Sequence, residues 1–529
     1  MKKNYVRYLI IFALFILIGC SDENSQKGRN GSEKSISETA GSASALHLTE
    51  LDDIKDKRIG VLLGSIHDLY ARKHFPNAKI LQYQNFSDLV IAVNSKKIDV
   101  AFFGHVYLPE VLQSNPEVGI FIERLYGIGI GAGFNKENTK LRDQFNAFLV
   151  EIKSNGIYAD MVNRYMDKRL SEMPEIKGSD ANGELKTGIV SEMGVPFAFI
   201  KNGRIAGFDF ELATRFAASL GKKLVPVDMH FASLLAAVST NKIDLITSSL
   251  AITDERKKQI DFSDPYFDSA TSLIARKENI EGYKNESVKP NKPSFIKSVA
   301  DSFYNNIILE KRYLLILDGL EVTILISILS ALLGTLIGAL ICFMRMSKSK
   351  LLSLSARFYI SLIRGTPVLV LLMIIFYIIF GSVNINANLV AIIAFGLNFG
   401  AYVSEMFRTS IQNIDNGQHE AGIASGFSGI QTFIYIIMPQ AIRQVLPVYK
   451  GEFISLLKMT SVVGYIAVQD LTKASDIIRS RTFDAFFPLI MAAVLYIIIA
   501  GLMTWGLSYM ETTTDPRRKR INKELEVNL

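Results

Sequence analysis

The sequence predicts a two-lobed α/β domain followed by an all-α membrane domain of five spans, and three observations support this fold class. Charged residues, 21% of the 529, lie mostly before about position 313, and the stretch that follows holds apolar runs long enough to cross a bilayer. Residues 86–101 and 231–246 repeat one pattern, a helix-like apolar spacing, a basic turn and an "IDV" or "IDL" strand. Finally, β-rich runs at 57–64 and 184–190 open two segments in which strands and helices alternate.

These alternating segments predict two lobes that face one another around a cleft, where a small ligand would bind. We assign residues 49–171 to one lobe and some additional helices, 172–184 to a linker and 185–278 to the other lobe. The net charge of +7 does not indicate nucleic-acid binding, because the basic residues mix with acids or flank apolar spans. The two cysteines, Cys20 and Cys342, offer neither a disulfide framework nor a thiolate metal site. We therefore expect no metal, no cofactor and no nucleic-acid partner.

The N-terminus is typical of an export signal, with basic residues before the apolar run "YLIIFALFILIG". The run ends at Cys20, and "LIGC" resembles the lipobox of bacterial lipoproteins. This resemblance implies that residues 1–20 are a signal peptide and that Cys20 becomes acylated, which ties the chain to membrane lipid. An uncleaved anchor is the alternative. Residues 21–48 are small, polar and unpatterned, which predicts a flexible tether.

The stretch "SSLAITDERKKQIDFSDPYF" at 248–267 resembles the first lobe of the solute-binding proteins of polar amino-acid ABC transporters. The resemblance implies that Arg256 binds the carboxylate of the ligand, and a planar guanidinium is suited to this role because it offers two parallel donors. Thr253 is placed to cap the helix that presents Arg256. A solvated arginine on a surface helix is the alternative. The resemblance adds four more ligand-binding residues, Ser248, Ser249, Ala251 and Phe197.

The second lobe of the same family is also recognisable, but it comes first in the chain. Residues 54–80 resemble that lobe and residues 141–166 resemble its last helices. The resemblance implies a circularly permuted periplasmic-binding-protein clamshell, with new ends near Ala45 and Lys277, where one strand that crosses between the lobes would be cut. Two truncated binding domains in tandem are the alternative. Gly64 and Ser65 match the family's turn that donates backbone N–H groups to the ligand carboxylate.

Two departures from the family pattern concern the ligand. Gly194 stands where relatives place an aromatic residue that stacks on the ligand, and Gly104 stands where they place an aspartate that holds its ammonium group. A carboxylate in the cleft would normally neutralise that ammonium. His105 or Asp68 is a candidate replacement. The ligand class implied is a polar amino acid of the glutamine, histidine or glutamate type, and the individual ligand stays open.

The membrane part begins after a linker and an amphipathic interfacial helix at 279–312, which alternatively packs against the spans. The permease domain covers 313–515, and a cytoplasmic tail covers 516–529. Basic residues in the first loop and the tail place both inside, so an odd number of spans puts the N-terminal domain outside the cytoplasmic (inner) membrane. The five expected spans are 321–344, 359–380, 389–407, 445–468 and 486–507.

Between the third and fourth spans, "EAGIASG", nine residues and then "IIMP" resemble the EAA loop of ABC permeases, with Gly422 and Met438 as departures. The resemblance implies a rigid knob that contacts a cytoplasmic ATPase: a short helix, a glycine able to take positive φ, and a second helix stopped before a proline. An amphipathic surface hairpin is the alternative. The coupling residues implied are Glu420, Ala421, Gly426 and Pro439.

The chain has no "GxxxxGK[ST]" motif, so we expect that it does not bind ATP by a P-loop and is not itself an enzyme. The sequence predicts a fused importer subunit, which captures a polar amino acid and passes it through its own permease domain. The expected partners are an ABC ATPase dimer and a second copy of the permease. A ligand-gated channel or sensor is the rival function, and a clamshell that only regulates transport is a third.

Overall fold

The computed structural model describes residues 47–170, 172–176, 178, 181–283, 295–381, 383, 385–484 and 486–514. The chain divides into two units, Met1–Leu46 and His47–Leu529, and the fold below is that of the second. The signal peptide, Cys20, most of the tether and the C-terminal tail lie outside the described residues.

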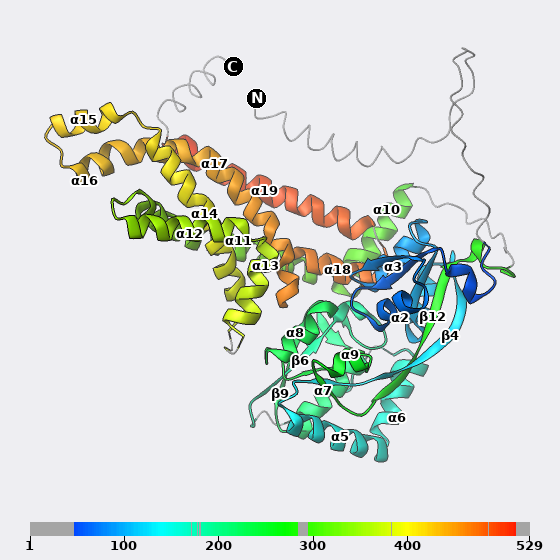
Figure 1. Cartoon of the computed structure of the whole chain (residues 1–529). Coiled ribbons are helices and arrows are strands. Elements are labelled where there is room, and N and C mark those ends of the chain that lie inside the picture. Colours follow the sequence, from blue (N-terminus) through cyan, green and yellow to red (C-terminus); the bar gives the residue numbers. More distant parts are fainter. Residues whose placement is uncertain are drawn as a thin grey trace, which may run out of the picture. The chain divides into compact units, whose positions relative to one another are not determined.

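Two five-stranded sheets are the centres of the two lobes (Figure 1), and a two-stranded sheet is formed by β7 (Phe199–Lys201) and β8 (Arg204–Ala206). The first lobe contains Arg256, and its strand order is β11 (Asp261–Phe262), β5 (Gly133–Phe134), β10 (Leu245–Ile246), β6 (Glu184–Ile189) and β9 (Lys223–Asp228). The second lobe contains Gly64, and its strand order is β2 (Lys79–Tyr83), β1 (Arg58–Leu62), β3 (Val100–Gly104), β12 (Phe267–Arg276) and β4 (Val118–Ile130).

The central strands β1 and β3 of the second lobe are apolar and mostly buried. Strand β3 is buried along its whole length, between β1 and β12. Gly60 in β1 leaves room for the Ile98 side chain, since a Cβ at position 60 would lie 2.3 Å from Ile98 Cδ1. The lobe's helices are α2 (Ile66–His74), α3 (Phe86–Asn94) and α4 (Leu108–Ser114). Those of the first lobe's own segment are α7 (Phe208–Ser219), α8 (Leu234–Ser239) and α9 (Asp254–Lys257).

Two further helices, α5 (Thr139–Ser154) and α6 (Ile157–Val162), follow the second lobe in the chain and pack on the first. The Phe145 and Phe216 rings meet edge to face at 4.9 Å, and Tyr165 donates a hydrogen bond to the buried Glu211 carboxylate at 2.8 Å. Arg164 binds both oxygens of the same carboxylate. The segment 139–167 thus completes the lobe most of whose strands come later in the sequence.

The chain passes between the lobes at two places, from β4 into β5 and from β11 into β12. Strands β4 and β12 are paired antiparallel from Phe267↔Ile130 to Arg276↔Val118. The expectation that one crossing strand is cut near Lys277 was therefore wrong. Strand β12 is uncut and pairs with both β3 and β4. The described part of this domain starts and ends beyond the end of β12, where Leu48 forms a β-bridge with Ile280.

The rest of the described chain is helical. Three helices are long and apolar enough to cross a membrane: α11 (Tyr313–Met346), α14 (Ala387–Gln412) and the Phe486–Tyr509 part of α19 (Phe486–Thr514). Two bent pairs pass the same criterion, which gives up to five spans by length and composition. The shorter helices are α12 (Lys350–Gly365), α13 (Val368–Met373), α15 (Asn416–Ala424), α16 (Gly429–Thr432), α17 (Met438–Met459) and α18 (Leu471–Thr482).

The first bent pair differs from the single span that the sequence predicted, whereas the second bends at the end of the span predicted at 445–468. The segment expected as one span at 359–380 turns by 108° between α12 and α13, at Thr366 and Pro367. Proline begins a helix readily but lacks the N–H needed to continue one, so α13 starts in a new direction there. The second pair, Gly429–Ile466 with Leu471–Thr482, is bent by 56°. The described helices α11, α14 and α19 match their predicted spans.

Glycines bring α11 and α14 close together along their length. A Cβ at Gly334 would lie 2.7 Å from the Gly396 carbonyl oxygen, and one at Gly400 would lie 3.1 Å from that of Gly334. Gly338 similarly faces Val403 and the Gly400 carbonyl. Each helix thus carries two glycines four residues apart on the shared face, the spacing that allows close backbone approach between membrane helices.

A helix, α10 (Phe295–Phe303), lies in the segment that we expected at the membrane interface, and a wider helical turn, Tyr304–Ile308, follows it. Val299 and Phe303 are exposed, whereas Ile307 is buried in a cluster with Leu315 and Leu471 of the membrane part. The end of this segment therefore packs against the helical bundle, as the alternative interpretation allowed.

Candidate functional site

Arg256 lies between the two lobes. Its helix α9 begins at the N-cap Thr253, whose side chain accepts a hydrogen bond from the Arg256 N–H at 3.2 Å, as the sequence predicted. The guanidinium donates to the Ala251 carbonyl in its own lobe and to the Gly64 carbonyl in the other, both at 2.8 Å. The side chain that the sequence assigned to the ligand carboxylate therefore bridges the cleft.

The Arg256 guanidinium stays charged although only 5% of the residue is exposed. Burial lowers its pKa to about 10, which still leaves it protonated at neutral pH. Its central carbon lies 5.4 Å from the centre of the Phe231 ring, which supports a cation on its face. No acidic side chain among the described residues is paired with this guanidinium, so its charge is available to an anionic ligand group.

Gly64 and Ser65 form the turn that enters α2. Gly64 has φ +71°, a conformation that glycine adopts without strain. Ser65 caps the helix by accepting a hydrogen bond from the Asp68 N–H, and its own N–H donates to the Leu62 carbonyl at 3.1 Å. The structure thus brings this turn to Arg256 through the Gly64 carbonyl, and the predicted donation of N–H groups to a ligand stays a prediction.

Ser249 and Ala251 line the cleft beside Arg256. Ser249 has φ +48° and its N–H donates to the Asp209 carboxylate at 2.7 Å. Asp209 is fully buried and also accepts a hydrogen bond from Tyr266 at 2.7 Å. Burial raises the pKa of Asp209 to about 7, which these two donors only partly offset. Asp209 therefore positions the Ser249 loop without facing the cavity.

Ser248 and Phe197 do not reach the cavity, although the sequence placed both at the ligand. The Ser248 hydroxyl accepts a hydrogen bond from the Val190 N–H at 3.0 Å and is fully buried at the end of β6. Phe197 lies in the core, with ring centres 5.6 Å from Tyr107 and 5.3 Å from Phe267. Both residues support the walls of the cleft from behind.

The cavity around Arg256 is small, about 50 Å³, which is space for water rather than for an amino acid. The lobes are thus closed on one another in this structure. Sequence reasoning missed the four ring-bearing side chains on its walls, although Tyr107 stands just after strand β3, where ligand-facing residues are common in open α/β sheets. These missed residues are His67, Phe86, Tyr107 and Phe231.

His67 is an uncharged member of the cleft. Its ring is buried and Nδ1 lies 3.1 Å from the Tyr126 hydroxyl. Burial, aided by the nearby Arg256 charge, lowers the pKa of His67 to about 4. At neutral pH the imidazole therefore adds no second cation to the cleft.

The two residues proposed to replace the missing aspartate do not line the cavity. Asp68 binds Arg72 at 2.8 Å and Gln82 at 2.5 Å within its own lobe. His105 Nδ1 lies 3.0 Å from the Ser272 hydroxyl. Neither side chain is placed for direct contact with a ligand beside Arg256.

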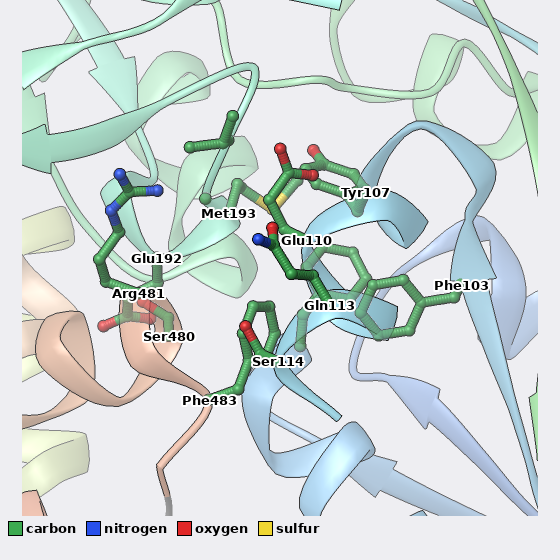
Figure 2. Close-up of a pocket in the computed structure, with 13 residues that line it drawn as sticks. Phe103, Tyr107, Glu110, Gln113, Ser114, Glu192, Met193, Ser480, Arg481 and Phe483 are labelled. Atoms are coloured by element: carbon green, nitrogen blue, oxygen red, sulfur yellow. The ribbon is translucent and has the colours of Figure 1, made fainter. Parts of the chain in front are cut away.

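A second cavity of about 170 Å³ adjoins the first, and the two share Phe86, Tyr107 and Met193. Figure 2 shows Tyr107, Glu110 and Gln113 on one side of it and Glu192 with the α18 residues Ser480 and Arg481 on the other. Its carboxylates already have cationic partners: Arg169 lies 3.3 Å from Glu110, and Lys473 lies 2.6 Å from Glu192.

Helix α18 of the membrane part contacts both lobes. Lys473, 2% exposed, meets Glu192 of the first lobe, and Arg479 pairs with Asp88 of the second. Burial opposes ionisation of Glu192, but the Lys473 charge and the neighbouring His230 outweigh it and lower the pKa of this carboxyl. Tyr465, in the turn before α18, exchanges hydrogen bonds with Gln84 of the second lobe. Helix α18 thus forms ion pairs with both lobes.

The EAA-like segment folds as an exposed helical hairpin, α15 and α16 (Figure 1). Gly426 has φ +87°, as the turn between the helices requires. Gly422 is buried against α16, and a Cβ there would lie 2.5 Å from Thr432 Cγ2, which explains the glycine at this position. Large apolar side chains are exposed on the hairpin and the turn that follows it: Ile423, Phe427, Ile430, Ile434 and Tyr435. Such a patch on a polar hairpin is typical of a protein-binding surface.

Pro439 does not end the second helix of this hairpin, so that expectation was wrong. The helix continues from α16 through the wider turns of Phe433–Ile437 into α17, where Pro439 lies in the first turn. Pro439 is the second residue of α17, directly after the wider turns, so the N–H that it lacks falls where the regular α-helical hydrogen-bond pattern has only just begun. The hairpin and α17 therefore form one continuous helical path.

Comparisons with known proteins match both parts of the chain. A family model of bacterial extracellular solute-binding proteins, family 3, matches residues 187–425. The putative glutamine transport system permease protein GlnP of Rickettsia typhi is 37% identical over 204 residues, 38% of this chain and 93% of that protein. The L-cystine transport system permease protein TcyB of Bacillus subtilis is 38% identical over 200 residues, 37% of this chain and 85% of that protein.

A crystal structure of an amino acid ABC transporter with histidines is 35% identical, covers 42% of this chain and 98% of its own, and has a TM-score of 0.36. The matched family model begins in β6 of the first lobe, whereas the second lobe's strands β1 to β4 precede it. The chain therefore belongs to the permease family of amino-acid ABC transporters and carries in the same polypeptide a domain of the family 3 extracellular solute-binding proteins.

Proposed function

We propose that the chain captures a polar amino acid in its own cleft and passes it through its own permease helices, driven by a separate ATPase. The names of the relatives, which refer to glutamine and cystine transport, support a polar amino acid as the ligand. In this proposal the clamshell faces the outside of the cytoplasmic membrane. Two permease domains and two ATPases complete the transporter.

One observation carries the proposal: the same chain contains an arginine in the cleft between two lobes and an exposed hairpin that resembles the ATPase-coupling segment of ABC permeases. Arg256 supplies an unpaired positive charge between two lobes. The hairpin α15–α16 has exposed apolar side chains and continues into α17. The chain then continues into α18, which forms ion pairs with both lobes. Capture and coupling are thus connected through one continuous stretch of the chain.

Circular permutation explains how this clamshell is assembled. The supporting observations are the helices α5 and α6, which precede the first lobe in the chain yet pack on it, and the bridge between Leu48 and Ile280 where the domain begins and leaves. Both strands that join the lobes stay intact in this arrangement. One complete clamshell is therefore a better description than two truncated domains.

The ATPase contact is tested by co-purification of the affinity-tagged full chain with its ATPase. We expect Gly422→Val to abolish co-purification, because its side chain would collide with Thr432 and separate α15 from α16. Gly429→Ala is the matched control, since a Cβ at Gly429 meets nothing within 4 Å, and it should leave the complex intact. Equal recovery of the ATPase with both variants would contradict the coupling role of the hairpin.

A further inference from the structure

The cleft contains one cation and, among the described residues that line it, no carboxylate. Its only charged lining side chain is Arg256, and the other polar side chains are the hydroxyls of Ser65, Ser249, Ser269 and Tyr107 and the imidazole of His67. An ammonium group buried there would lack a counter-charge, which is costly in a desolvated site. The positive electrostatic potential that Arg256 creates inside the cleft therefore favours a ligand with net negative charge.

Tyr107 occupies the space in which a side chain at position 104 would lie. A Cβ at Gly104 would lie 2.9 Å from Tyr107 Cδ2 and 3.1 Å from Cε2. The ring is held in place by Phe86, at 5.2 Å between ring centres, and by Phe197 of the other lobe, at 5.6 Å. Gly104 and Tyr107 thus act as a pair, in which the small residue makes room for the large one.

The Tyr107 hydroxyl is buried and makes no hydrogen bond to the described residues, although the residue is only 5% exposed. Burial raises the pKa of the phenol, and the Ser249 side chain offsets this effect only in part. Leaving a buried hydroxyl without a partner costs free energy, so such a group normally meets a ligand or an ordered water. The residue lines both adjoining cavities, which places it on the ligand's path.

We propose that Tyr107 is the specificity-determining residue that meets the α-substituent of the ligand, and that the cleft accepts 2-hydroxy acids at least as well as the corresponding amino acids. This inference rests on the proposed function, because it assumes that Arg256 binds the carboxylate of the ligand. A phenol both donates and accepts hydrogen bonds, so it can pair with an ammonium or a hydroxyl group. A carboxylate in the same place would accept only and would select the ammonium.

The preference follows from charge. The carboxylate next to the hydroxyl of a 2-hydroxy acid pairs with the one positive charge of the cleft, whereas an amino acid with the same side chain also brings an ammonium cation. The nearest acids of the second cavity, Glu110 and Glu192, are already paired with Arg169 and Lys473 and do not neutralise it. Exchange of the ammonium for a hydroxyl therefore removes a desolvation cost without removing a salt bridge.

The test is isothermal titration of the full-length protein in lipid nanodiscs with matched pairs: L-glutamine, L-glutamate and L-histidine, each against its 2-hydroxy analogue. In every pair that binds, we expect the 2-hydroxy acid to have an equal or lower Kd. A more than tenfold preference for the amino acid would overturn this inference and leave the proposed function intact. Absence of binding by both members of all pairs would overturn the capture step itself.

Two variants assign the effect to Tyr107. Tyr107→Phe should weaken binding of the 2-hydroxy acid about tenfold, which corresponds to about 1.4 kcal/mol, and Tyr158→Phe, which removes a hydroxyl outside the cleft, should not. The double variant Gly104→Asp with Tyr107→Ala puts a carboxylate in place of the phenol and should reverse the preference toward the amino acid. Unchanged affinities in Tyr107→Phe would contradict the role of its hydroxyl even if the double variant does not fold.

Discussion

Asp209 shows how a residue outside the cleft controls its geometry. Its carboxylate holds the Ser249 N–H and the Tyr266 hydroxyl, and the pKa is raised from 3.8 to about 7 because the group is fully buried. The folded chain therefore keeps a proton on this side chain under conditions in which the unfolded chain has lost it. Its protonation links the stability of the cleft to pH.

The sign of this linkage is a testable prediction. Between pH of about 4 and about 7 the folded state binds one more proton at Asp209 than the unfolded state, so this group's contribution to the free energy of unfolding falls as pH rises. We expect the Asp209→Asn variant to lose that part of the pH dependence. The measurement is the thermal unfolding midpoint of the wild type and the variant at pH 5 and pH 7. The same change in midpoint between the two pH values in both proteins would contradict the raised pKa of Asp209.

Sequence reasoning identified some residues of the cleft and misplaced or missed others, and the contacts of each residue explain the difference. Thr253 and Arg256 were predictable because a cap and a helix follow from a few adjacent letters. The sequence placed Ser248 and Phe197 at the ligand. Only the folded lobe shows that the Ser248 hydroxyl accepts a hydrogen bond from the Val190 N–H and that the Phe197 ring lies in the core. Tyr107 was missed because its importance depends on Gly104, three residues away, and on Phe197 in the other lobe.

The helices of the membrane part are defined by their glycines and prolines as much as by their apolar length. Apolar runs alone predicted α11, α14 and α19. The same runs gave no sign of the 108° bend at Pro367, nor that the helix continues through Pro439, since proline both ends and begins helices. The close packing of α11 on α14 depends on which face Gly334 and Gly396 occupy, and the count of five spans stays a prediction.

This packing predicts the effect of a single substitution. Gly334→Leu would place a side chain against the Gly396 carbonyl oxygen, which lies 2.7 Å from the Cβ position. This oxygen belongs to the backbone of α14, which cannot easily shift to relieve the collision. We expect a loss of about 1–3 kcal/mol, the usual cost of overpacking, seen as a lower thermal unfolding midpoint in detergent. Gly501→Leu on α19 is the control, since its Cβ would meet nothing within 4 Å. Equal midpoints for the two variants would contradict the close contact.

At the scale of the whole molecule, the order of the chain differs from the order of its parts in space. Most of the second lobe comes first, helices α5 and α6 of the first lobe follow it, and most strands of the first lobe come third, before β12 returns to the second lobe. The repeat predicted two lobes and the family resemblance implied their order, but the two intact crossings were apparent only from the pairing of β4 with β12. The permease then continues from the same polypeptide, so binding domain and membrane domain are present in equal number.

The central claim is that the chain's own cleft delivers the ligand, and uptake by proteoliposomes tests it most directly. Vesicles would contain the full chain and its ATPase, with no other binding protein, and transport of labelled glutamine, glutamate and histidine would be measured with ATP inside. We predict uptake of at least one of them by the wild type, loss of that uptake in Arg256→Ala, and normal uptake in Arg72→Ala, which removes an exposed arginine of the second lobe. Full uptake by Arg256→Ala would contradict delivery through this cleft.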